Sequence, residues 1–275
     1  MSKTDMKKYG LTKKYKNEFL ADKQKVGRII SRDNENYKVI TEYGILAAEV
    51  SNKLKYEAKS LSDYPVVGDF VTVENDNNQL NSTIIEISER KNYLIRKGEW
   101  DVNYDHIIAA NIDTVFICLS LNNDFNIQKL KAYINIALNC KAETVIVLTE
   151  CDSFTNIDNI LKEVQEQTKE MEVIVTSDMD SDNYKSVKNF IKEGKTSVFI
   201  GPEHAKSKIV NKILGDIHFE NQLVLINGGG IIINTPEMRE LGIESENITK
   251  KFVDTLNWIY FFPPILKNQM NYLVF

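Results

Sequence analysis

The sequence predicts an α/β protein in which a small all-β barrel precedes a sheet of mostly parallel strands. Apolar residues alternate with a period of two between residues 26 and 87, which is typical of strands. From residue 103 onward, short apolar runs alternate with amphipathic helical runs, which is typical of βα units. Residues 197–215 read as a strand, a loop with Lys206 and Ser207, and a helix, the order of a phosphate-binding loop.

Composition places the chain among globular proteins with a sizeable core. It has 275 residues, of which 43% are hydrophobic, and this length allows about two domains. No window approaches the run of about 18 apolar residues that a membrane span needs, and residues 1–9 have no secretory pattern. Cys118, Cys140 and Cys151 are widely spaced, so they indicate neither a disulfide framework nor a zinc site. We therefore expect a cytoplasmic protein without a membrane partner.

Charge is distributed unevenly along the chain. Residues 1–100 hold 18 basic and 15 acidic side chains, whereas residues 101–275 hold 16 and 24. A basic N-terminal part on an acidic chain fits contact with a polyanion such as RNA. An ordinary solvated surface explains the same excess, and charge alone leaves both interpretations open.

The N-terminal part reads as a short arm followed by five strands. Turn residues such as Asn, Asp and Gly separate the apolar runs. The expected strands cover residues 26–32, 37–41, 45–50, 70–74 and 81–87. A five-stranded barrel of this size suits an OB-fold, whose strands and loops bind oligonucleotides. We place this unit at residues 1–100.

A basic segment follows the last of these strands. Four cations, Arg90, Lys91, Arg96 and Lys97, surround Tyr93. Cations can neutralise phosphates while an aromatic ring stacks on a base, so these five residues are the candidate RNA contacts. The alternative is a linker with solvated lysines.

The second unit, residues 101–247, reads as a parallel α/β sheet. Expected strands cover residues 114–120, 144–148, 171–175, 198–200 and 230–233, with helices at 127–142, 157–167, 184–193 and 208–215. Ligands in such sheets bind beyond the carboxyl ends of the strands. We expect this sheet to be separate from the barrel. A last helix is expected at residues 248–259.

In this order of elements, the chain resembles the bacterial small-ribosomal-subunit-dependent GTPase family called RsgA or YjeQ. The segments that carry the resemblance are residues 37–44, 65–69, 109–117, 121–126 and 228–242. The resemblance implies an OB-fold barrel followed by a circularly permuted P-loop GTPase domain and a zinc-binding domain. It also implies GTP and Mg²⁺ as ligands, GTP hydrolysis as the activity, and the 30S ribosomal subunit with its rRNA as the partner.

The resemblance also assigns the base-recognition residues. The family motif Thr-Lys-x-Asp is matched by Thr149 and Asp152, while Glu150 replaces the Lys. Asp152 would bind the guanine edge, although a carboxylate at a strand end is also a common helix N-cap. Ser177 lies where the family has its second base-contact loop.

The phosphate-binding loop departs from the family pattern. Gly201, Lys206 and Ser207 remain, but the loop is one residue short. Pro202 has no N–H to offer a phosphate, and Glu203 adds a negative charge where anions bind. We expect a segment that is related to a P-loop by descent but no longer functions as a phosphate-binding loop.

The remaining motifs depart as well. Asn234 and Glu237 stand where the family has a Mg²⁺-linked Asp and a Gly beside the γ-phosphate. Between Ser207 and Asn234 the chain is too short to hold the family's switch loop. Residues 248–275 look like a remnant of the zinc domain without its ligands, so no zinc is expected.

The sequence thus predicts an RsgA-like 30S biogenesis factor that binds rRNA through its barrel as a monomer. Its GTP site is expected to be degenerate, with impaired or absent hydrolysis and no assigned catalytic or metal-binding residue. GTP and Mg²⁺ remain doubtful cofactors. One alternative is an active GTPase in which Lys206 binds phosphate, Ser207 binds Mg²⁺ and Asp152 binds guanine. The other is the non-functional product of a decaying gene.

Overall fold

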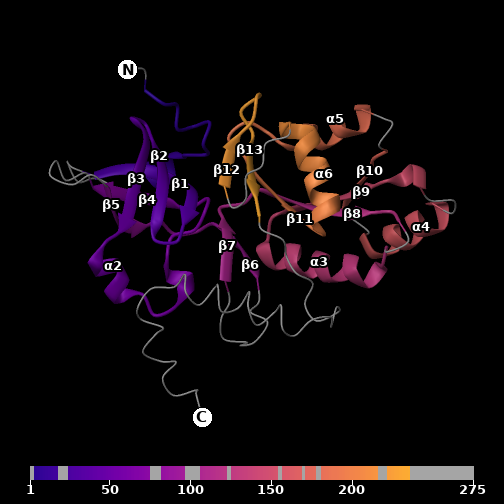
Figure 1. Cartoon of the computed structure of the whole chain (residues 1–275), viewed down its shortest axis with the longest axis horizontal. Helices are drawn as coiled ribbons and strands as arrows, with labels where there is room; N and C mark the ends of the chain where they lie inside the picture. The colour runs from indigo at the N-terminus through magenta and orange to yellow at the C-terminus, as the bar shows by residue number, and fades with distance from the viewer. Residues whose placement is uncertain are drawn as a thin grey trace, which may run out of the picture.

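The computed structural model describes nine segments of the chain, with a barrel at one end and an α/β sheet at the other (Figure 1). The described residues are 3–17, 24–74, 82–96, 106–122, 125–153, 157–168, 171–177, 181–215 and 222–235. The expected boundary near residue 100 lies outside them, as do Glu237, the helix expected at 248–259 and the unit at 248–275. Those expectations stay predictions.

Five strands form a closed barrel, as the period-two pattern predicts. They are β1 (Gln24–Asp33), β2 (Asn36–Thr41), β3 (Gly44–Val50), β4 (Phe70–Glu74) and β5 (Ser82–Ile87). Their order is β1-β2-β3-β5-β4, and β4 closes the barrel by pairing with β1. A short helix α2 (Asn52–Glu57) and a 3₁₀ turn (Leu61–Asp63) connect β3 to β4. Alternate apolar side chains of the strands, such as Ile29, Val39 and Ile84, fill the interior.

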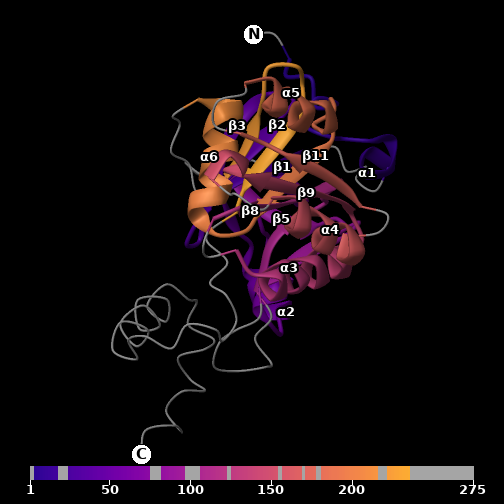
Figure 2. The same cartoon turned by 90° about the vertical axis from the view of Figure 1, so that its right-hand side faces the viewer.

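Six strands form the α/β sheet. In spatial order they are β12 (Gln222–Leu225), β13 (Ile231–Asn234), β11 (Thr196–Ile200), β8 (Thr114–Ser120), β9 (Glu143–Thr149) and β10 (Glu172–Val175), all parallel except β12. Helices α3 (Ile127–Cys140) and α4 (Ile157–Thr168) cover one face, and α5 (Ser181–Phe190) and α6 (Glu203–Leu214) cover the other (Figures 1 and 2). Because both faces are covered, every residue of β8 is buried.

The barrel and the α/β sheet are not separate. Strand β1 of the barrel pairs with β12 through Ser31 and Gln222, so eleven strands form one hydrogen-bonded series. The expectation of two separate sheets is therefore wrong at this point. The physical reason is that β12 is the antiparallel edge strand of its sheet, and an open edge is a template for another strand.

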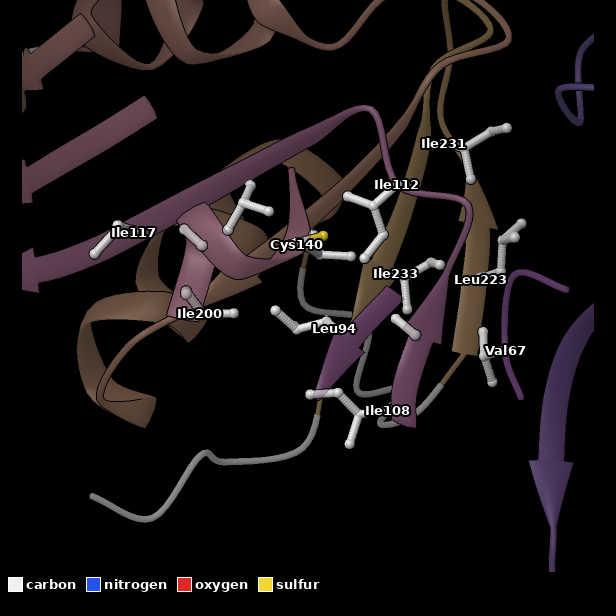
Figure 3. Close-up of a cluster of buried hydrophobic side chains, with 14 of the residues drawn as sticks. Val67, Leu94, Ile108, Ile112, Ile117, Cys140, Ile200, Leu223, Ile231 and Ile233 are labelled. Atoms are coloured by element: carbon white, nitrogen blue, oxygen red, sulfur yellow. The ribbon is translucent and has the colours of Figure 1, made fainter. Parts of the chain in front are cut away.

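A two-stranded hairpin beside the barrel was not expected from the sequence. It consists of β6 (Tyr93–Arg96) and β7 (His106–Ala110). Leu94 and Ile108 belong to the same cluster of buried apolar side chains as Cys140 of α3, with Leu94 drawn beside Cys140 (Figure 3). The sequence did not predict β6 because this strand has only four residues and lies among basic side chains. An alternation of apolar and polar residues over so few positions does not distinguish a strand from a linker.

The N-terminal arm packs against the barrel. It contains the short helix α1 (Lys13–Asn17). Met6, Leu11 and Tyr15 are buried, and the Tyr15 ring stacks on Phe70 with 4.2 Å between centroids. The arm is therefore part of the folded core.

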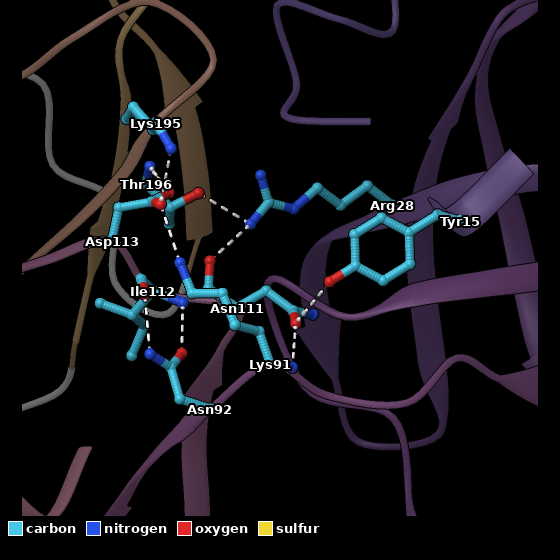
Figure 4. Close-up of polar contacts among 9 residues, drawn as sticks. All are labelled: Tyr15, Arg28, Lys91, Asn92, Asn111, Ile112, Asp113, Lys195 and Thr196. Atoms are coloured by element: carbon cyan, nitrogen blue, oxygen red, sulfur yellow. Dashed lines mark hydrogen bonds and ion pairs between the residues drawn. The ribbon is translucent and has the colours of Figure 1, made fainter. Parts of the chain in front are cut away.

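A buried arginine joins the arm, the barrel and the α/β sheet. Arg28 of β1 is 1% exposed. Its guanidinium donates to the carbonyls of Tyr9 (2.8 Å) and Gly68 (3.1 Å). It also donates to the hydroxyl of Thr196 (2.9 Å) at the start of β11, as Figure 4 shows. Its charge also lies over the Phe70 ring, 4.8 Å from the centroid. These contacts come from three segments, namely the arm, the barrel and the α/β sheet, so Arg28 fixes how the segments sit together.

A second set of polar contacts lies beside Arg28 in the same junction. The Asp113 carboxylate accepts hydrogen bonds from Lys91 (2.8 Å), Lys195 (3.2 Å) and the Thr196 amide (2.9 Å) (Figure 4). Burial alone would raise the pKa of Asp113, but these donors bring it below its ordinary value. Asn111 accepts from the Tyr15 hydroxyl at 3.2 Å and so adds the arm to the junction.

Candidate site at the carboxyl ends of the parallel strands

Four loops with candidate residues meet at the carboxyl edge of the parallel sheet. They follow β9, β10, β11 and β13, as the sheet topology requires. Direct contacts join them: Ser177 donates to the Asp152 carboxylate, and the Lys208 ammonium lies 3.0 Å from a Glu150 carboxylate oxygen. The structure therefore brings the sequence-predicted nucleotide-binding residues together.

Lys206, the candidate phosphate-binding residue, points into the protein. It is 2% exposed, and its ammonium donates to the backbone carbonyl of Thr235 at 2.6 Å. A carboxylate oxygen of Glu203 lies 2.7 Å from the same ammonium. Thr235 is held in place because its hydroxyl donates to the carbonyl of Phe199 at 2.8 Å. Both partners of the Lys206 ammonium are therefore groups of the protein itself.

The expected phosphate loop is largely helical. The sequence predicts a loop at residues 201–207 and a helix from residue 208, but α6 already begins at Glu203. That expectation is wrong. Pro202 has a φ of −54°, and its carbonyl accepts the amides of Ala205 (3.1 Å) and Lys206 (3.0 Å). Proline is pre-set for a helix start, and the Glu203 charge favours the positive end of the helix dipole.

Ser207 and Gly201 both have local structural roles. The Ser207 hydroxyl donates to the carbonyl of Glu203 at 2.7 Å, one turn back in α6. Gly201 has a φ of +137°, and a Cβ there would lie 2.1 Å from the carbonyl oxygen of Cys118 on β8. No other residue fits that approach without strain. The glycine is therefore required by packing whether or not a phosphate binds.

The base-recognition residues are held by contacts on β9 and β10. The Thr149 hydroxyl is buried and lies 3.0 Å from that of Ser120. Besides its bond from Ser177, the Asp152 carboxylate accepts from the Cys151 thiol at 3.7 Å. Glu150, with a left-handed φ of 63°, pairs with Lys208 of α6. A carboxylate–ammonium pair thus lies where the family motif has a lysine.

Comparisons with known proteins identify the family. The model of the family described as RsgA GTPase matches residues 87–224. A protein of Lactiplantibacillus plantarum, named small ribosomal subunit biogenesis GTPase RsgA 2, is 32% identical over 90% of this chain and 75% of its own length. The chain belongs to the RsgA GTPase family. A Listeria monocytogenes protein of the same name is 27% identical over 86% of this chain and 72% of its own. The predicted family resemblance is confirmed.

Solved structures confirm the fold of this family member. YjeQ from Thermotoga maritima aligns with a TM-score of 0.64 at 21% identity, covering 80% of this chain and 77% of that one. YloQ, described as a circularly permuted GTPase, aligns with a TM-score of 0.58 at 20% identity, covering 80% and 74%. The predicted barrel and circularly permuted α/β architecture are therefore correct.

The candidate RNA contacts are partly engaged within the family fold. Arg90 is bidentate to Asp69 at 2.8 Å and also donates to the carbonyls of Ser62 and Tyr64. Lys91 pairs with Asp113. Tyr93 is 43% exposed on β6. The structure describes only the backbone of Arg96, and Lys97 lies outside the described residues. The RNA role of these five residues stays a prediction.

Several partners in the site were not predicted from the sequence. Glu203 was expected to place a negative charge where anions bind, and Glu150 to stand in place of the family's Lys, whereas the structure pairs the two glutamates with Lys206 and Lys208. Spacing offered a signal for the first pair, since residues three apart in a helix are neighbours. Pairing of Glu150 with Lys208 depends on how β9 and α6 pack, and no local pattern indicates it.

Two features, a metal cluster and a membrane-spanning helix, are absent from the described segments. In them, no group of three or more His, Cys, Asp or Glu side chains is placed to hold a metal ion. Over the same segments, no helix is both long and apolar enough to cross a membrane. Asn234, the candidate for the Mg²⁺-linked position, lies at the end of β13.

Proposed function

We propose that this chain is a small-ribosomal-subunit biogenesis factor whose nucleotide site is closed by its own side chains, so that it acts without binding or hydrolysing GTP. The names of its relatives support the ribosomal part. The engagement of Lys206 with Thr235 and Glu203 carries the second part. The cytoplasm, where small subunits are assembled, is its proposed location, and 30S rRNA its proposed partner.

Lys206 would have to leave two partners to meet a triphosphate. In a phosphate-binding loop, the lysine reaches the β- and γ-phosphates. Here the ammonium is buried between a carbonyl and a carboxylate. Releasing it leaves the Thr235 carbonyl without that donor, and a buried group that loses its partner costs about 1–3 kcal/mol. The closed arrangement therefore competes with ligand binding.

The backbone donors are committed as well. A phosphate loop works because successive amides turn inward on the phosphates. Pro202 has no amide hydrogen, and the amides of Ala205 and Lys206 bind the Pro202 carbonyl. Turning them toward a phosphate requires the first turn of α6 to unwind. Phosphoryl transfer depends on positioned donors and a held Mg²⁺, and the described residues do not fit that set.

Electrostatics acts in the same direction. A phosphate entering beside Glu203 would compete with that carboxylate for Lys206. Two like charges about 4 Å apart repel by about 4 kcal/mol at an intermediate dielectric. The Glu150 carboxylate is paired with Lys208, so the repulsion of a polyphosphate is assigned to Glu203.

An active GTPase remains the second candidate because the base side of the site is kept. Thr149, Asp152 and Ser177 lie together at the ends of β9 and β10. In that case Lys206 would leave its partners on binding and Ser207 would turn toward Mg²⁺. The two candidates differ in whether GTP changes the behaviour of the protein on the ribosome.

Pelleting with ribosomal subunits tests the proposal. Purified protein is sedimented with small subunits in Mg²⁺ buffer without nucleotide, with GDP, with GTP and with a non-hydrolysable GTP analogue. We expect the same bound fraction in all four conditions, and much less binding to large subunits as the control. A several-fold increase with GTP would contradict the closed site. Equal, weak binding to both subunits would contradict the ribosomal role and favour a non-functional product.

A further inference from the structure

An exposed tyrosine stands at the tip of the β2–β3 hairpin of the barrel. The turn is tight, since Thr41 pairs directly with Gly44. The Thr41 hydroxyl accepts the amide of Tyr43 at 3.2 Å and donates to the carbonyl of Gly44 at 2.9 Å. Tyr43 is 57% exposed. An aromatic ring is thus presented to solvent from a turn that is fixed by hydrogen bonds.

Two lysines from different segments lie over this ring. The ammonium of Lys3, on the arm, is 5.2 Å from the ring centroid, and that of Lys25, on β1, is 5.0 Å away. These are cation–π distances. Lys3 also pairs with Glu42 at 3.1 Å, and the amide of Thr4 donates to the Glu42 carbonyl. Lys25 forms no ion pair with any of the described residues.

Other exposed side chains of this part of the protein belong to β3 and to the arm. Ile45, which follows the turn on β3, is 61% exposed and adds an apolar surface. Lys7 and Lys8 of the arm are exposed and have no ion pair within the described segments. Asp5 lies between Lys3 and Lys7, where its carboxylate accepts the Lys7 amide. Two lysines, Lys3 and Lys25, thus lie over the aromatic ring, and Lys7 and Lys8 follow Lys3 along the arm.

We propose that Tyr43, Lys3 and Lys25 form a stacking site for single-stranded RNA on the barrel. An unpaired base stacks on the exposed part of the Tyr43 ring, while the two ammonium groups contact the flanking phosphates. Single strands are the fitting class because their bases are free to stack on aromatic side chains. That the natural ligand is ribosomal RNA rests on the proposed function, but binding of a free oligoribonucleotide does not depend on that role.

This site differs from the basic segment expected at residues 89–97. There Arg90 is held by Asp69 and two carbonyls, and Lys91 by Asp113. At the hairpin tip, Tyr43 keeps an exposed surface beside its two lysines, and Lys25 has no ion pair among the described residues. The RNA contact is therefore assigned to the β2–β3 turn and the arm.

Fluorescence anisotropy with a labelled, unstructured oligoribonucleotide tests the site in the full-length protein. Base stacking contributes about 1–3 kcal/mol per base, so Tyr43→Ala is expected to weaken binding about tenfold. Tyr43→Phe keeps the ring and is expected to bind like wild type. Tyr56→Ala is the matched control, because Tyr56 on α2 is 91% exposed and no cation lies over its ring among the described contacts. A duplex RNA of equal length is expected to respond little to Tyr43→Ala.

The lysines give a second readout. Lys3→Gln with Lys25→Gln is expected to lower the slope of log affinity against log salt by about 0.7 for each phosphate that the protein no longer neutralises. Lys131→Gln with Lys141→Gln, which removes one lysine within α3 and the lysine at its C-cap, is expected to leave the slope unchanged. Equal affinity of Tyr43→Ala and wild type, or an equal loss in Tyr56→Ala, would overturn the proposal. That result would leave subunit pelleting unaffected, so failure of the RNA site and of the ribosomal role are distinguishable.

Discussion

Replacing Arg28 by alanine is expected to lower the free energy of unfolding by about 4 kcal/mol, a large fraction of the stability of a typical domain. The guanidinium is 1% exposed and satisfies acceptors on Tyr9, Gly68 and Thr196. Alanine leaves a cavity and removes the donor from each of them at once. Burial also lowers the pKa of Arg28 to about 10, which reflects a charge held away from water.

Urea denaturation followed by circular dichroism measures this change. Arg28→Lys is expected to be nearly as unstable, because an ammonium cannot reproduce the fork of the guanidinium. Arg32→Ala is the matched control on the same strand. Arg32 is partly exposed and makes longer contacts, to the carbonyls of Asn34 (3.2 Å) and Pro65 (3.4 Å), so its loss is expected to cost under about 1 kcal/mol. A similar, small cost for Arg28→Ala would show that the junction does not depend on this side chain.

Lys206→Ala is expected to lower the free energy of unfolding by about 3 kcal/mol. In the closed site, the lysine is a structural residue whose stem is buried and whose ammonium holds Thr235 and Glu203. Truncation removes both the packing and the hydrogen bond. In an open phosphate site, the same substitution would remove a ligand contact and leave the stability of the nucleotide-free protein nearly unchanged.

Lys206→Met separates packing from charge. Methionine keeps most of the buried volume and loses only the ammonium, so we expect a smaller cost of about 1 kcal/mol. Thermal unfolding of both variants without nucleotide makes the comparison. A cost below about 0.5 kcal/mol for Lys206→Ala would indicate that the lysine is not part of the core.

The barrel strands could be predicted from the sequence because alternation and turn residues agree along residues 24–87. The start of α6 could not, because Lys206 and Ser207 fit a known loop motif. Pro202 and Glu203 are typical of a helix start and therefore indicated a helix from Glu203. The sequence thus contained evidence for both a helix and a loop at this position, and the loop motif was given more weight.

The grouping of the site residues followed from topology, whereas their partners did not. Strand ends of a parallel sheet meet at one edge, so Asp152, Ser177 and Lys206 were expected to lie close together. The acceptor of Lys206 is a backbone carbonyl, that of Thr235. Its position depends on how β13 ends beside β11, which residue types do not reveal. For the same reason, the contacts of Arg28 across three segments had no signal in the sequence.

Equilibrium titration with a fluorescent GTP analogue tests the closed site most directly. Wild-type protein is titrated with and without Mg²⁺, with Lys206→Ala as the matched variant. A site whose donors are bound to Thr235, Glu203 and Pro202 is expected to show a Kd no tighter than about 1 mM, which corresponds to about −4 kcal/mol. It is also expected to show no difference between the two proteins. Micromolar, Mg²⁺-dependent binding by wild type that is lost in Lys206→Ala would contradict the closed site and establish a working GTP site.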